Sequence, residues 1–128
     1  GLYGVVETTV MQYDQSILFG SKLFPNKGAS GSNTNACVTS AGLTTAIQLD
    51  AADPILAELP AQDSVSADSD AKGATPTAFG LTAAVDALIA SNNEAGSFII
   101  LVTDGAANCN KDAFDNFGNG AQFFDLFE

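Results

Sequence analysis

The chain of 128 residues contains no histidine and no arginine, and its four lysines stand against fifteen acidic residues. Without histidine, the Ser-His-Asp and Cys-His arrangements that activate nucleophiles cannot be built from this chain, and without arginine no guanidinium can hold a phosphate. A formal net charge of −11 also leaves little positive charge to neutralise the phosphates of nucleic acid. We therefore expect neither an enzyme nor a nucleic-acid-binding protein.

Long apolar runs are also missing, and cysteine is scarce. No apolar run approaches the ~20 residues that cross a bilayer, so we expect no membrane span. The two cysteines, Cys37 and Cys109, are too few for a disulfide scaffold and show no metal-binding spacing. They could form one bridge, because both lie in loops that can meet at one end of a sheet, or they could be two free thiols. A bridge would indicate an exported protein, since thiols in the cytosol stay reduced.

The 46% of hydrophobic residues can support the core of one domain. Their spacing predicts an alternation of helices and strands. We expect helices at residues 2–14, 53–59 and 76–91, strands at 17–24, 44–49 and 98–102, and connections at 26–42 and 60–74. Thr75 is predicted to cap the third helix and Pro76 to begin it. The interpretation of residues 1–128 is thus a single α/β domain.

The run at residues 98–102, Phe-Ile-Ile-Leu-Val, is the clearest signal in the chain. Apolar side chains on both faces are typical of a strand covered on both sides, as in a parallel sheet. Asp104 follows this strand closely, at the carboxyl end where ligands bind in open α/β sheets. The hydroxyl of Thr75 and the carboxylate of Asp104 are hard oxygen ligands, which suit Mg²⁺ or Ca²⁺. Asp104 could also be an ordinary turn or capping acid.

These motifs resemble a von Willebrand factor A domain. Thr75, in residues 73–77 (Gly-Ala-Thr-Pro-Thr), is similar to the family's metal-site threonine, and Asp104, in residues 102–105 (Val-Thr-Asp-Gly), to its strand-end aspartate. Residues 18–25 and 108–110 further resemble secreted bacterial A domains of the kind common in myxobacteria. The resemblance implies a Rossmann-like three-layer sandwich with a mostly parallel central sheet. It also implies an adhesion site that binds a partner's carboxylate through Mg²⁺, Ca²⁺ or Mn²⁺, with Thr77 as the fallback ligand to Thr75.

The family's Asp-x-Ser-x-Ser loop is absent, and with it three of the expected ligands. The pattern would place that loop just before Gly1, so we expect a partial domain, incomplete at both ends. Such a module would be secreted, at the cell surface or periplasmic.

Two further functions stay open. A subunit that binds no metal could assemble through exposed sheet edges and the phenylalanine-rich residues 112–128, although these phenylalanines are also expected as core of a larger domain. A phosphatase using Asp104 as nucleophile is disfavoured, because charge-stabilising groups are scarce. The acidic loop at 60–74 is expected to be a solvated connector, with a second cation site as the alternative.

Overall fold

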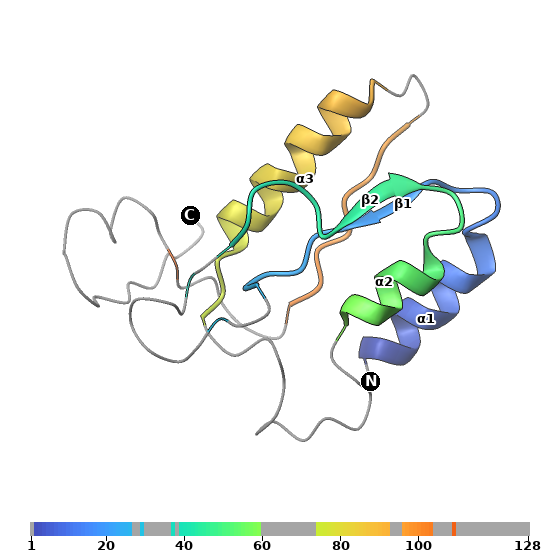
Figure 1. Ribbon diagram of the computed structural model, residues 1–128, viewed down its shortest axis with the longest axis horizontal. Coiled ribbons are helices and arrows are strands. Elements are labelled where there is room, and N and C mark those ends of the chain that lie inside the picture. The colour runs from blue at the N-terminus through green and yellow to red at the C-terminus, as the bar shows by residue number, and fades with distance from the viewer. Residues whose placement is uncertain are drawn as a thin grey trace.

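The computed structural model describes residues 2–26, 29, 37, 39–59, 74–92, 96–103 and 109. Three helices and two strands form in this part of the chain (Figure 1). In chain order they are α1 (Leu2–Tyr13), β1 (Phe19–Ser21), β2 (Thr45–Gln48), α2 (Ala52–Glu58) and α3 (Thr77–Ser91). The helices lie within one residue of the bounds predicted from hydrophobic spacing, whereas both strands are shorter than predicted.

The two strands pair with each other in antiparallel fashion. Phe19 is opposite Gln48 and Ser21 is opposite Thr45, with an irregularity in the register between Phe19 and Ser21. Gly20 sits at this irregularity, where a Cβ atom would approach Ile47 Cγ1 to 2.9 Å, so the close approach of the strands requires glycine. The mixed α/β class is confirmed. The described residues contain this antiparallel pair and no parallel one, so the parallel sandwich is not seen in them.

The main core lies where α1, α2 and β1 meet. Figure 1 shows α1 and α2 side by side on one side of the strands, with α3 on the other. Val10, Ala51, Ala52 and Ile55 are buried together, and Val6 and Phe19 pack against them. Small alanine side chains let α2 approach α1 closely, and the core is therefore narrow.

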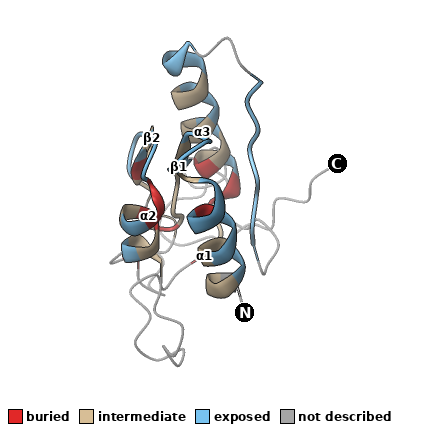
Figure 2. Ribbon diagram, turned by 90° about the vertical axis from the view of Figure 1, so that its right-hand side faces the viewer, coloured by how far each residue is buried: buried red, intermediate tan, exposed pale blue. Residues whose placement is uncertain are grey.

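The apolar run at residues 98–102 does not form the predicted buried strand. It belongs to neither of the described strands, and its side chains are exposed, from 40% for Ile99 to 88% for Phe98. Figures 1 and 2 both show residues 96–103 as an extended segment that runs back along α3 in the opposite direction. A strand that is apolar on both faces needs neighbours to cover both, whereas each of these side chains keeps at least 40% of its surface exposed.

Only a small part of the surfaces of α1 and α3 is buried. On α1, Val10 is buried, but Val5 is 66% exposed and Tyr13 is exposed as well. On α3, Ile89 is 72% exposed, while the buried positions are Thr77 and Gly80 in its first turn. In the described residues, α1 thus buries Val10, and α3 buries the start of the helix.

Candidate functional site

The turn before α3 holds the threonines that the sequence analysis singled out. Thr75 C=O accepts a hydrogen bond from Thr77 N–H at 2.9 Å, and Pro76 between them has φ −79° and ψ 60°. These angles and this bond define an inverse γ-turn. The prediction that Thr75 caps the helix and Pro76 begins it was wrong. Pro76 is the N-cap, α3 begins at Thr77, and the N-cap residue makes no side-chain capping hydrogen bond.

Thr77 is the most unusual polar residue of this turn. Its side chain is 1% exposed, and in the described part of the chain its Oγ1 atom has no hydrogen-bond partner. A buried hydroxyl without a partner destabilises the folded state by about 1–3 kcal/mol. Thr39 Oγ1 is the other buried oxygen without a partner among the described residues. Thr75, by contrast, is half-buried and does have an interaction partner.

A disulfide bridge fixes the turn to two distant loops. Cys37 and Cys109 are joined, with their Cα atoms 5.8 Å apart, so the structure contains the bridge that the sequence left as one of two alternatives. Ala74 and Cys109 are buried together and Cys37 packs against them. Cys109 comes five residues after Asp104 in the sequence, and Ala74 directly precedes Thr75. Cys109, held by the bridge, therefore packs against the residue before Thr75. Asp104 itself lies outside the described residues.

Electrostatics limits what this turn can bind. The first backbone N–H groups of a helix carry partial positive charge, which favours an anion and disfavours a bare cation. A divalent cation near the start of α3 would thus need a carboxylate to offset that field. The hydroxyls of Thr75 and Thr77 can supply neutral oxygen ligands, and Thr77 Oγ1 is an acceptor without a donor. The donor set fits Mg²⁺ or Ca²⁺ if Asp104 contributes its charge.

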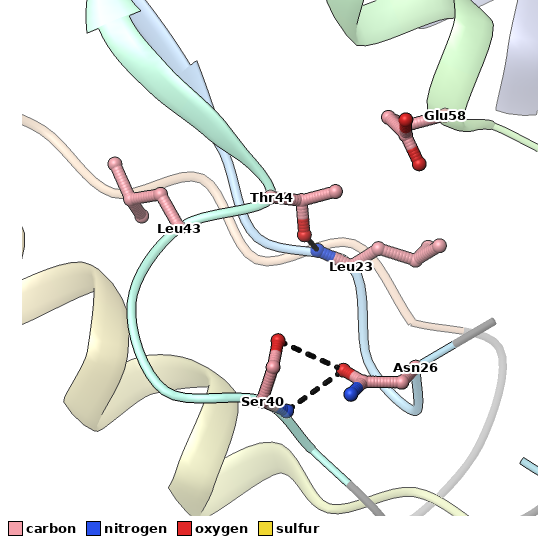
Figure 3. A pocket seen from close by; sticks show the side chains of 6 residues that line it. All are labelled: Leu23, Asn26, Ser40, Leu43, Thr44 and Glu58. Atoms are coloured by element: carbon pink, nitrogen blue, oxygen red, sulfur yellow. Dashed lines mark hydrogen bonds between the residues drawn. The ribbon is translucent and has the colours of Figure 1, made fainter.

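The structure also contains a pocket whose lining includes neither Thr75 nor Thr77 (Figure 3). It has a volume of about 360 Å³ and is lined by residues of the β1–β2 connection and the end of α2: Leu23, Asn26, Ser40, Leu43, Thr44 and Glu58. Asn26 Oδ1 accepts hydrogen bonds from the Ser40 backbone N–H at 2.9 Å and from Ser40 Oγ at 3.2 Å. Thr44 Oγ1 accepts one from Leu23 N–H at 2.8 Å. These polar groups hold the two arms of the connection together.

Lys22 strengthens the same connection from outside the pocket. Its ammonium Nζ donates to the Ser40 carbonyl at 2.6 Å and to Ser40 Oγ at 3.0 Å. Partial burial lowers the pKa of Lys22 below its ordinary value, because desolvation disfavours the charged form. Sequence reasoning missed this network, since its members are isolated polar residues in a Gly/Ser/Asn-rich stretch with no periodic pattern. We interpret it as structural.

The chain was compared with protein-family models, with curated proteins and with solved structures, and none of the three comparisons found a match. In the part of the chain that the structure describes, no three acidic or cysteine side chains gather in a way that could hold a metal ion. No helix in that part has the length and apolar character to cross a membrane. Function therefore has to be argued from the turn, the bridge and the exposed surfaces.

Proposed function

We propose that this chain is an extracellular protein-interaction module of the von Willebrand factor A type, which binds its partner and does not catalyse a reaction. Thr75 and Asp104 would hold a divalent cation, Mg²⁺ or else Ca²⁺ or Mn²⁺, with Thr77 as the alternative hydroxyl. The bound cation would supply an open coordination position for an acidic side chain of the partner protein. The finer fold that goes with this proposal is the Rossmann-like sandwich with a mostly parallel sheet.

The observation that carries the proposal is the buried Thr77 hydroxyl without a hydrogen-bond partner at the start of α3. Folded proteins rarely leave such an oxygen unsatisfied, and a cation ligated there would satisfy it. The bridge adds a second support, because it holds Cys109, close in sequence to Asp104, beside the Thr75 turn. A disulfide also favours a secreted, cell-surface or periplasmic location over the cytosol.

The test is capture of the chain on two immobilised peptides of the same sequence, except that one carries a glutamate where the other carries a glutamine. We expect Mg²⁺-dependent capture on the glutamate peptide, lost when EDTA removes the metal and lost in Asp104→Ala. Asp53→Ala is the matched control, because it removes an exposed acid from α2, far in sequence from the Thr75 turn. Equal capture on the two peptides, or capture that persists in EDTA, would contradict a cation-bridged carboxylate.

A second candidate function is favoured by the exposed apolar run at 98–102. A metal-independent subunit would use such a surface, together with the phenylalanine-rich residues 112–128, to associate with other chains. Residues 112–128 lie outside the described residues. Association that persists in EDTA, and that weakens when Phe123 and Phe124 are replaced by serine, would support this function over the first.

A further inference from the structure

Residues 98–102 combine strand-like composition with exposure. The five side chains are all large and apolar, no charge occurs between Gly96 and Thr103, and none of the five belongs to a described strand. Phe98 is 88% and Ile100 78% exposed. From the exposed fractions, the five side chains offer on the order of 500 Å² of apolar surface, which is the size of the largest patch on a typical monomer. An extended apolar segment of this kind is a template for pairing with another strand.

We propose that residues 98–102 pair with the same residues of a second copy of this chain, as an antiparallel two-stranded ladder centred on Ile100. This inference rests on the second candidate function and names its partner. A two-fold axis at Ile100 places Phe98 opposite Val102 and Ile99 opposite Leu101. Every cross-strand pair is then apolar. The pairing of an aromatic with a β-branched side chain, as in Phe98 with Val102, is among the stabilising combinations. The segment is self-complementary, as a two-fold interface requires.

The acids beside the run select the antiparallel arrangement. Glu94 precedes the segment and Asp104 follows it. Parallel in-register pairing would set Glu94 against Glu94 and Asp104 against Asp104, and like charges directly opposite each other are destabilising. In an antiparallel arrangement centred on Ile100, no flanking residue lies opposite its own copy, so neither acid is set against the same acid of the second chain. The same repulsion opposes the parallel stacking of many copies that builds cross-β fibrils.

The area indicates a weak dimer. A stable interface buries about 800 Å² on each partner, and the run can supply at most roughly two thirds of that, because strand pairing leaves part of each side chain uncovered. The net charge of −11 on each chain adds long-range repulsion that salt screens. We therefore expect a weak, reversible dimer that tightens as ionic strength rises.

Sedimentation velocity of the whole chain in EDTA tests the inference. Ile100→Lys should weaken dimerisation by at least about tenfold, because it places two ammonium groups opposite each other at the two-fold axis. Ile89→Lys is the matched control, since Ile89 is an isoleucine of similar exposure, 72% against 78%, on α3. Equal weakening by both substitutions, or a wild-type chain that stays monomeric, would overturn the inference.

A cross-linking experiment tests the register. Residues opposite each other in an antiparallel pair have Cα atoms about 4.5–5.5 Å apart, within the range that a disulfide spans. Ile100→Cys should therefore form covalent dimers under mild oxidation, while Ile89→Cys should not. If replacing Phe123 and Phe124 abolishes association and Ile100→Lys does not, the second function stands and this pairing is wrong. The divalent-cation proposal is unaffected by either result, because the measurements are made in EDTA.

Discussion

The Cys37–Cys109 bridge closes a loop with a sequence separation of 72 residues, which contains β2, α2, α3 and the exposed run. Removing the bridge raises the conformational entropy of the unfolded chain, and this gain is larger for a longer loop. The chain-entropy relation gives ~3 kcal/mol for a 15-residue loop and ~4.7 kcal/mol for 100 residues, so a loop of this length corresponds to about 4 kcal/mol. A small domain is stable by about 5–15 kcal/mol in total. Cys37→Ser should thus remove a large share of the stability.

The assay is urea unfolding of wild type and Cys37→Ser, with and without reductant. Under oxidising conditions we expect the free energy of unfolding to fall by about 4 kcal/mol, equivalent to roughly 15 °C in melting temperature. In reductant the two proteins should differ little, because the wild type has then lost the same bridge. A drop of equal size in reductant would show that packing of Cys37 against Ala74 and Cys109, and not the covalent bond, explains the effect.

Two further predictions concern local packing and charge. Gly80→Ala should destabilise the protein by about 1–3 kcal/mol, because a Cβ atom there would come within 2.9 Å of Phe24 Cε1 and closer still to Cδ1. Gly4→Ala is also inside a helix but has no atom within 4 Å of the added Cβ, so it should stabilise the protein by about 0.5–1 kcal/mol. If urea unfolding shows both variants changing stability in the same direction, this packing is refuted. The pKa of Lys22 is lowered by desolvation, so between that lowered value and its ordinary 10.5 the unfolded state binds more protons and folding stability rises with pH. Unfolding measured from neutral to alkaline pH should show wild type gaining stability relative to Lys22→Met, and a constant difference would contradict the shift.

The helices were predictable because their signals are local. The apolar spacing in residues 2–14 and 76–91 anticipated Leu2–Tyr13 and Thr77–Ser91 within a residue at each end. The position of the cap was not predictable, since the choice between a capping threonine and a γ-turn at Pro76 depends on how the turn packs. The disulfide stayed open in the sequence for the same reason, because proximity of Cys37 to Cys109 depends on the arrangement of loops far apart in the chain.

The run at 98–102 shows where sequence patterns stop being informative. A strand of this composition is stable only where other strands pair with both of its edges and other elements cover both of its faces. Whether those surroundings are present depends on other segments, and the described residues do not provide them. For the candidate site, the sequence singled out Thr75, with Thr77 as the fallback ligand, but it did not indicate that Thr77 carries the buried oxygen without a partner. Asp104 remains a prediction, because it lies outside the described residues.

Calorimetric titration of Mg²⁺ into the chain tests the cation site most directly. Extracellular calcium modules bind with dissociation constants of about 10⁻⁴–10⁻³ M, and we expect an affinity of this order for wild type and Asp53→Ala. Asp104→Ala should abolish the binding heat, and loss in Thr75→Val or in Thr77→Val identifies the hydroxyl ligand. Unchanged affinity in Asp104→Ala, or no binding heat with wild type, would contradict a divalent-cation site in this chain.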